Sequence, residues 1–215
     1  MTSIISVVLL RVSIFYLEIF SLYSNHVLGA SAPESFKGRI VNGVDGDIEQ
    51  FQYQMLIVDD DFSLQLSLRV NSRHLCGASV ISLRIALSAA HCFDGGVHTK
   101  PKQVSLRGGS TSSKTGGQLF DVKQILLHPL YTPDHDYDVA IIYTKTDLQG
   151  QNIKPIQLPD VDYNLVPGSE CVVSGWGQLT VGDKTSSEIL RHINVSIVET
   201  TDCNAALIEQ GGVRK

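Results

Sequence analysis

A histidine and an aspartate in two short segments of this chain have side chains that could cooperate in proton transfer. His91 lies in residues 88–92, Ser-Ala-Ala-His-Cys, and Asp138 lies in residues 136–140, Asp-Tyr-Asp-Val-Ala. A neutral histidine is the natural general base near pH 7, because its unperturbed pKa is about 6.5. It can activate a serine hydroxyl when a buried carboxylate fixes its tautomer and stabilises the imidazolium. These segments therefore indicate a base, His91, and its orienting carboxylate, Asp138.

The elements that must position these residues are expected to be strands. From Ile40 onward, short apolar runs alternate with turn residues, and one of the runs follows Asp138 directly. Such a pattern indicates an all-β sandwich or barrel. A short helix is expected only at Thr201–Gln210, ended by Gly211. The predicted strands are Tyr53–Val58, Ala78–Ile81, Gln118–Leu127, Val139–Tyr143, Cys171–Trp176 and Ile189–Val198.

Composition excludes some classes of partner. The chain has 215 residues, a net charge of −5 and 18 glycines, which suits many strands joined by turns. No basic cluster is present in the sequence, so we expect no nucleic-acid partner. The acidic run Asp59-Asp60-Asp61 is interpreted as a solvated surface loop, with a recognition loop for basic partners as the alternative.

The N-terminus, residues 1–30, has the pattern of a secretory signal peptide. Its apolar segment is interrupted by Arg11 and Glu18, and a charge at the centre of a spanning helix costs about 2.5–3.5 kcal/mol. The small residues at 29–32 offer a cleavage site. We therefore expect a secreted, extracellular protein without a membrane anchor after signal removal. Secretion makes the four cysteines candidate disulfide partners, and their sequence positions leave all three pairings open.

Four motifs occur in order and together resemble the trypsin/chymotrypsin-like serine peptidases, the S1 family. The resemblance runs from Ile40 to the end of the chain. The motifs are His74-Leu75-Cys76-Gly77-Ala78-Ser79-Val80-Ile81, Ser88-Ala89-Ala90-His91-Cys92, His128-Pro129-Leu130-Tyr131 followed by Asp138-Val139-Ala140, and Ser174-Gly175-Trp176-Gly177.

This resemblance implies a fold and a set of site residues. The fold would be two six-stranded antiparallel β-barrels within a peptidase domain at 40–215, with the first barrel at about 40–152 and a partial second barrel at about 153–215. His91 and Asp138 would be catalytic, and Cys76 would form a disulfide with Cys92. Residues 31–39 would be an activation propeptide, removed by a trypsin-like protease that cleaves between Arg39 and Ile40.

Residues 1–215 depart from the family pattern at the nucleophile. The family's Gly-Asp-Ser-Gly-Gly segment does not occur in them. Ser174 lies in the segment with Gly175-Trp176-Gly177, which the family uses structurally, and neither it nor the pair Ser186-Ser187 lies in a Gly-flanked strained turn that would expose a nucleophile. A polypeptide of these residues alone is therefore expected to lack the serine and the oxyanion hole and to be inactive. By resemblance, Cys171 and Cys203 would each pair with cysteines further along the family sequence.

The function expected from the resemblance is a secreted serine endopeptidase that acts on protein or peptide substrates and meets protease inhibitors. The alternative is a non-catalytic homologue that binds a partner in a protease cascade. An intracellular structural protein is a third interpretation, which would require a fortuitous apolar N-terminus.

No cofactor is expected for any of these functions, and no metal. The stretch Ser105–Gly117 contains no carboxylate for calcium, and His98, His128, His135 and His192 have no zinc-type spacing. A glycosylation sequon begins at Asn194, whose side chain should point away from those of Ile193 and Val195.

Overall fold

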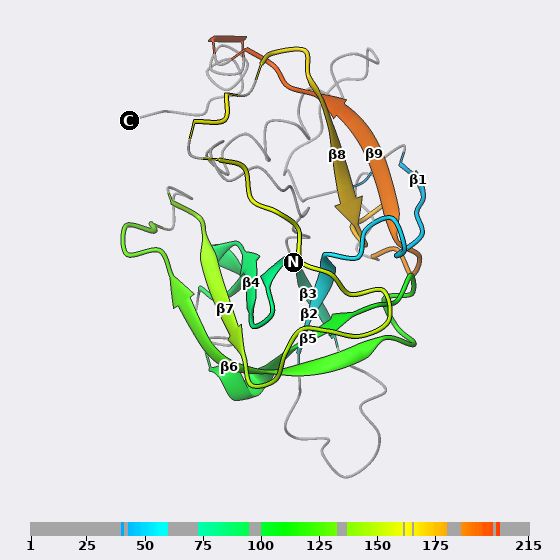
Figure 1. Ribbon diagram of the computed structural model, residues 1–215, viewed down its shortest axis with the longest axis vertical. Helices are drawn as coiled ribbons and strands as arrows, with labels where there is room; N and C mark the ends of the chain where they lie inside the picture. The colour runs from blue at the N-terminus through cyan, green and yellow to red at the C-terminus, as the bar shows by residue number, and fades with distance from the viewer. Residues whose placement is uncertain are drawn as a thin grey trace.

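Six strands of the computed structural model close into an antiparallel barrel (Figure 1). The structure describes residues 40, 43–59, 73–94, 100–132, 137–160, 162–164, 166–179, 186–199 and 201–202. Around the barrel the strand order is β2-β3-β4-β7-β6-β5, and every neighbouring pair is antiparallel. The strands are β2 (Gln54–Asp59), β3 (Arg73–Ser82), β4 (Ile85–Ser88), β5 (Val104–Gly108), β6 (Gln118–Leu127) and β7 (Ala140–Thr144).

A second sheet lies beside the barrel and contains three strands within the described part of the chain. Its order is β1-β9-β8, and the strands are β1 (Val44–Asp45), β8 (Glu170–Gly175) and β9 (Arg191–Ser196). Two short 3-10 helices, η2 (Ala90–Cys92) and η3 (Pro101–Gln103), join barrel strands. The prediction of an all-β protein built on a six-stranded antiparallel barrel, with a less complete second sheet, is confirmed.

All six strands that the sequence predicted are present. The prediction for β6 has the observed bounds, and those for β2, β7, β8 and β9 are displaced by one or two residues at either end. The predicted strand at 78–81 is the middle of the longer β3. Thr201 and Asp202 are helical, and the rest of the predicted helix lies outside the described residues. The predicted signal peptide and propeptide also lie outside them.

Strand β2 is buried on both faces, because it belongs to two hydrophobic cores. Alternate side chains of a strand point to opposite faces. Met55 and Ile57 therefore lie in the barrel interior, whereas Leu56 and Val58 pack in a second cluster with Trp176, which directly follows β8 of the second sheet. This arrangement explains why the sequence of β2 is an unbroken apolar run rather than an alternating one.

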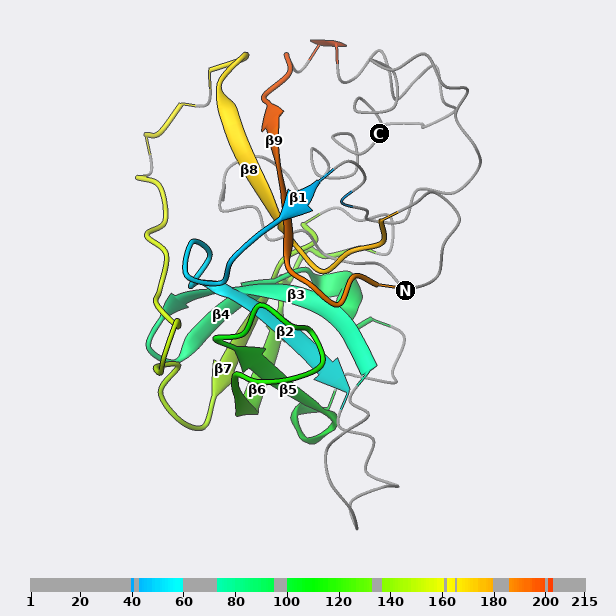
Figure 2. The same cartoon turned by 90° about the vertical axis from the view of Figure 1, so that its right-hand side faces the viewer.

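The stretch 109–117 after β5 joins the barrel to the second sheet through Thr111. The carbonyl oxygen of Thr111 accepts a hydrogen bond from the Trp176 indole at 2.8 Å and another from the backbone N–H of Leu190 at 2.8 Å. Its hydroxyl accepts one from the backbone N–H of Ile48 at 3.1 Å. The segment at 154–160 makes another crossing, running in extended form from the barrel toward β8 (Figure 2).

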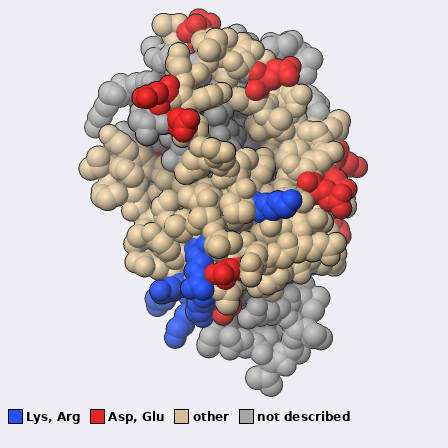
Figure 3. Space-filling model, in the orientation of Figure 1, with Lys and Arg blue, Asp and Glu red and all other residues tan. Residues whose placement is uncertain are grey.

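Charged side chains on the face shown in Figure 3 are scattered, apart from one small group of Lys and Arg over the barrel end. Ion pairs neutralise part of this charge: Lys145 Nζ lies 3.2 Å from Asp121 Oδ2, and Arg84 Nε lies 2.5 Å from Asp147 Oδ1. Within the described residues, no helix has both the length and the apolar character needed to cross a membrane.

Candidate active site

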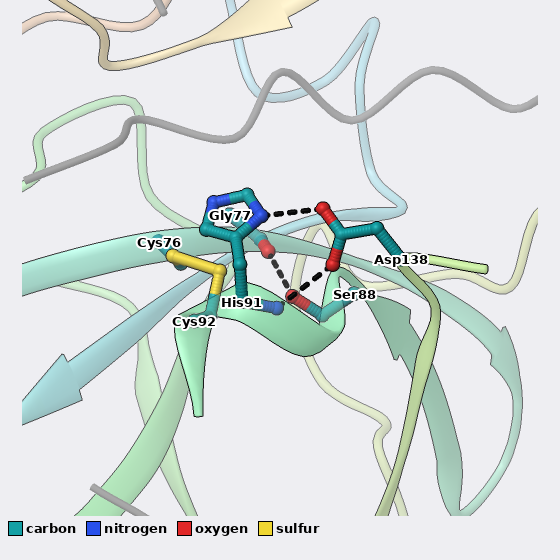
Figure 4. Close-up of a disulfide and its surroundings, with 6 residues drawn as sticks. All are labelled: Cys76, Gly77, Ser88, His91, Cys92 and Asp138. Carbon is teal, nitrogen blue, oxygen red and sulfur yellow. Dashed lines mark hydrogen bonds and ion pairs between the residues drawn. A yellow bond between two sulfur atoms is a disulfide. The ribbon is translucent and has the colours of Figure 1, made fainter. Parts of the chain in front are cut away.

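His91 is held against the barrel by the short helix η2. The residue before this helix, Ala89, has extended backbone with φ −92° and ψ 149°, and both Ala89 and Ala90 are buried. Their small side chains let the turn pack closely on the barrel. On its other side, Cys92 forms a disulfide with Cys76 of β3, with a Cα–Cα distance of 6.3 Å. The disulfide that the family resemblance implied is therefore present (Figure 4).

Asp138 lies two residues before β7, the last barrel strand in the sequence, and its side chain contacts His91. Its side chain is 1% exposed, and both carboxylate oxygens face His91. Oδ2 lies 2.5 Å from His91 Nδ1, and Oδ1 accepts a hydrogen bond from the backbone N–H of His91 at 2.8 Å. The two residues singled out in the sequence are thus brought into direct contact (Figure 4).

The backbone just before Asp138 has an unusual conformation. Tyr137 has a φ of 53°, in the left-handed region that residues with a Cβ rarely adopt. Its ring stacks on the imidazole of His128, with centroids 4.8 Å apart and planes inclined by 6°. The backbone N–H of His128 donates to Val139 at 2.9 Å. These contacts fix the residues on either side of Asp138, and no local sequence pattern pointed to them.

A second aspartate, Asp94, adds negative charge near this pair and is hydrogen-bonded to Tyr131. The hydroxyl of Tyr131 donates to Asp94 Oδ2 at 3.1 Å. The pKa of Tyr131 is raised to about 12, by partial burial first, then by this hydrogen bond and by the charges of Asp94 and Asp138. Tyr131 therefore stays protonated at neutral pH and remains a donor. The sequence analysis gave this pair no role.

Comparison with known proteins identifies the family. A sequence model described as Trypsin matches residues 57–215, which is well over half of the chain. The chain belongs to the trypsin family.

Individual relatives agree with the family assignment. The chain is 33% identical over 178 residues to Trypsin 5G1 of Aedes aegypti, which covers 82% of this chain and 61% of that protein. It is 32% identical over 186 residues to Hypodermin-A of Hypoderma lineatum, covering 83% and 66%. Identity with Transmembrane protease serine 9 of Rattus norvegicus is 37% over 153 residues, or 69% of this chain and 14% of that protein. The trypsin-family chain thus spans less than two thirds of the length of each of these relatives.

The fold also matches a solved structure. A scabies mite inactivated protease paralogue, S-D1, superposes with a TM-score of 0.69 and 24% sequence identity, over 80% of this chain and 68% of that one. At this identity the likeness shows the trypsin-like fold alone.

Ile40, the residue that would follow the activation cleavage, is buried in this trypsin-family chain. Its side chain is 1% exposed, and its backbone N–H donates to the carbonyl of Gln178 at 3.0 Å. Gly43 makes room for it, because a Cβ at that position would lie 2.4 Å from Ile40 Cγ2. Arg39 lies outside the described residues.

The described serines that the sequence analysis weighed as nucleophiles are in different environments. Ser174 is fully buried and donates to Gln54 Oε1 at 2.9 Å. Ser186 is exposed, as a surface turn would require. Ser187 is 7% exposed and donates to the carbonyl of Ile189 at 2.6 Å. Its burial results from packing of the loop after β5 onto this segment, where Ser113 donates to the Ser187 carbonyl at 3.1 Å.

The remaining residues singled out in the sequence have the following environments. Cys171 in β8 is half-buried and is bonded to no other cysteine among the described residues, and burial raises the pKa of its thiol. Cys203 lies outside the described residues. Asn194 in β9 is exposed, whereas Ile193 and Val195 are half-buried, as strand alternation predicts for an accessible sequon. His128 and His192 are structural in this chain, stacking on Tyr137 and packing on Phe51 respectively.

Proposed function

We propose that this trypsin-family protein is a serine endopeptidase in which His91 is the general base and Asp138 orients it. The observation that supports the proposal is the double contact of the Asp138 carboxylate with the ring and the backbone of one histidine. A carboxylate that accepts two hydrogen bonds in this way has a fixed rotamer. It can hold the Nδ1–H tautomer of His91 and stabilise the imidazolium that forms when a proton is taken up.

In the proposed reaction, His91 Nε2 accepts the proton of a serine hydroxyl as the oxygen attacks a peptide carbonyl. The protonated imidazole then donates this proton to the departing amine. The burial of Asp138 at 1% exposure keeps water from competing for its oxygens. The His91 side chain as a whole is 15% exposed.

The nucleophile would come from the family's Gly-Asp-Ser-Gly-Gly segment, which residues 1–215 do not contain. A polypeptide of these residues alone is therefore proposed to be inactive. Removing the serine costs about 10⁶ in kcat in subtilisin, an unrelated serine protease with the same triad. The residual catalysis of about 10³–10⁴ over water depends there on the oxyanion hole and on substrate binding. Ser174 and Ser187 cannot substitute, because both are buried and donate elsewhere.

The proposal includes secretion and activation by cleavage between Arg39 and Ile40. The buried side chain of Ile40 and its hydrogen bond to Gln178 support a role for the new N-terminus as an anchored end rather than a free tail. A trypsin-like enzyme would make the cut, because such enzymes cleave after arginine. Protein or peptide substrates and protease inhibitors are the proposed partners.

The test begins with the transcript, sequenced across the codon for Lys215. If the reading frame continues into Gly-Asp-Ser-Gly-Gly, the encoded protein is secreted from cells, cleaved after Arg39 and treated with a fluorophosphonate probe. We expect one labelled serine and hydrolysis of peptide substrates. A polypeptide of residues 1–215, prepared in parallel, should remain unlabelled.

Variants of the serine-containing product test the assigned roles. His91→Ala should reduce kcat by about 10⁶, and Asp138→Asn by about 10⁴, the loss measured for that substitution in a well-studied member of this family. His128→Ala, which changes a histidine stacked on Tyr137 rather than bonded to Asp138, is the matched control. Retention of full activity by His91→Ala would rule out this base. A frame that stops after Lys215 would favour the non-catalytic binding protein instead.

A further inference from the structure

Asn194 in β9 begins Asn194-Val195-Ser196, an acceptor sequence for N-linked glycosylation. No other asparagine of residues 1–215 is followed at the second position by serine or threonine. Asn194 and Ser196 are both exposed, whereas Val195 between them is half-buried and points to the opposite face of the sheet. The strand therefore presents the amide that would be modified and the hydroxyl that the acceptor sequence requires on one accessible face.

The exposed face on which Asn194 lies continues onto the neighbouring strand. Residues that are directly opposite each other in an antiparallel pair have side chains on the same face of the sheet. Asn194 is opposite Val172 of β8 and Ser196 is opposite Glu170, and both of these β8 residues are exposed as well. Val172, which is 41% exposed, is the apolar member of this set. A glycan on Asn194 would thus extend over a solvent-facing surface rather than into the protein.

At Asn194, β9 has a described partner strand on one edge only. β1 pairs with Arg191 and His192 at the start of β9 and does not extend to Asn194 (Figure 2). The open edge of a sheet and an exposed apolar side chain are places where other chains can associate. A large hydrophilic group at Asn194 would obstruct such association, because glycans are bulky and solubilising.

We propose that Asn194 carries an N-linked glycan that covers Val172 and the open edge of β9. This inference rests on the secretion included in the proposed function, because the modification takes place in the secretory pathway. In the reaction, the side-chain nitrogen of Asn194 forms a bond to the anomeric carbon of a glycan carried on a lipid diphosphate. The bond from that carbon to the diphosphate oxygen breaks, the lipid diphosphate leaves with the electron pair, and one amide proton passes to solvent.

Cell-free translation of the full chain with endoplasmic-reticulum membranes tests the modification directly. The chain is made with its own N-terminus and, in parallel, with an established signal peptide, and protection from added protease identifies the molecules that have entered the lumen. We expect the protected molecules to carry one glycan, which peptide N-glycosidase releases while converting Asn194 to aspartate. Protected molecules without a glycan would overturn the inference. Entry with the established signal peptide alone would instead count against the proposed secretion, and the protected molecules would still decide the glycan.

Substitutions within the acceptor sequence test which residue is modified. Asn194→Gln and Ser196→Ala should each abolish the glycan, and Ser196→Thr should retain it, because the acceptor sequence accepts either hydroxyl residue at this position. Asn164→Gln is the matched control and should retain the glycan, since Asn164 is also exposed but has Val166 at the second position after it. A glycan that persists in Asn194→Gln would place the modification elsewhere and refute the assignment.

The covering of Val172 is tested by sedimentation of the purified full chain, with circular dichroism to verify the fold of each variant. Asn194→Gln should aggregate more than the glycosylated protein. Val172→Thr in the same background should reverse part of this increase, because threonine keeps the branched shape and is polar. Leu83→Thr, at a residue that is 55% exposed on the barrel, is the control and should not reverse it. Equal aggregation of Asn194→Gln and the glycosylated protein, or equal reversal by both threonine variants, would contradict the covering role.

Discussion

The hydroxyl of Ser174 donates a 2.9 Å hydrogen bond to Oε1 of Gln54, and both side chains are fully buried where the barrel meets the second sheet. Gln54 begins β2, and Ser174 lies near the end of β8. A polar group buried in an apolar contact is stabilising only in the arrangement that satisfies it. This pair therefore sets the relative position of the two sheets, more specifically than the surrounding apolar contacts do.

Loss of this hydrogen bond should lower stability measurably. Ser174→Ala is expected to reduce the free energy of unfolding by about 1–3 kcal/mol, the cost of a buried hydrogen-bonding group that loses its partner. Urea denaturation measures the change. A double-mutant cycle with Gln54→Met should give a coupling energy of about 0.5–3 kcal/mol. Ser110→Ala, which removes an exposed hydroxyl hydrogen bond at 2.7 Å, is the control and should cost less. Additive effects at Ser174 and Gln54 would contradict the assigned link.

Substitution of two glycines with positive φ, Gly117 and Gly168, distinguishes the cost of backbone strain from the cost of a steric clash. Gly117 has φ +67°, and a Cβ there would lie 2.4 Å from the carbonyl oxygen of Gly108. Gly168 has φ +84°, with nothing within 4 Å of its would-be Cβ. Gly168→Ala should therefore cost only the left-handed conformation, about 1–2 kcal/mol. Gly117→Ala should cost about 2–5 kcal/mol, since overpacking is added. Equal losses of unfolding free energy for the two variants in urea denaturation would show that the loop at Gly117 shifts and relieves the clash.

Acid should destabilise the barrel through His74. Burial holds the pKa of His74 down to about 4, against a smaller opposing effect of the Cys76 backbone. The unfolded chain, with a pKa of about 6.5, binds the proton more readily. His74 therefore leaves stability unchanged above about pH 7 and lowers it as the pH falls from about 6.5 to 4, by about 2 kcal/mol between pH 7 and pH 5.

His74→Gln should remove most of this pH dependence, because glutamine does not titrate in this range. Urea denaturation at pH 7 and pH 5 makes the comparison, with His128→Gln as the control for loss of a histidine elsewhere. A wild-type protein whose stability does not change between these two pH values would refute the burial argument.

Arg107 in β5 reaches the loop that follows this strand, within the stretch Ser105–Gly117 in which the sequence offered no carboxylates for calcium. Its side chain is 7% exposed, and Nη1 donates to the carbonyls of Lys114 at 3.2 Å and Gly116 at 3.1 Å. A fixed cation thus holds carbonyl oxygens of the kind that calcium would bind. Neither added Ca²⁺ nor EDTA should shift the thermal midpoint.

Arg107→Met should cost about 1.5–3 kcal/mol for each hydrogen bond lost from the charged group, and it should expose the peptide bond after Lys114 to added trypsin. Arg107→Lys keeps the charge but not the planar fork, so partial protection is expected. A calcium-dependent midpoint in the wild-type protein would contradict the assignment of this role to Arg107.

Local patterns predicted the strands that have enough apolar residues to show a period. β6 was predicted with its observed bounds because it has ten residues and clear turn residues before it. β4 was missed because it has only four residues, and β5 because Arg107 and Gly108 end its apolar alternation. Two-residue β1 has no pattern of its own and exists only through its pairing with β9.

The residues of the candidate site also differ in whether the local sequence predicted them. Small residues before His91 and an apolar run after Asp138 gave local signals for two elements that must meet. Tyr137 gave none, because its left-handed backbone depends on the ring of His128, a residue of another segment.

The pairing of β1 with β9 has a consequence for synthesis. Asp45 and Arg191, which face each other in this pair and form an ion pair, are 146 residues apart in the sequence. At about 5–20 residues per second, a ribosome needs roughly 7–30 s to add those residues. During that interval the barrel strands can emerge and close, while Val44 and Asp45 have no strand to join. The first residues of the domain to leave the ribosome are thus among the last to reach their final place.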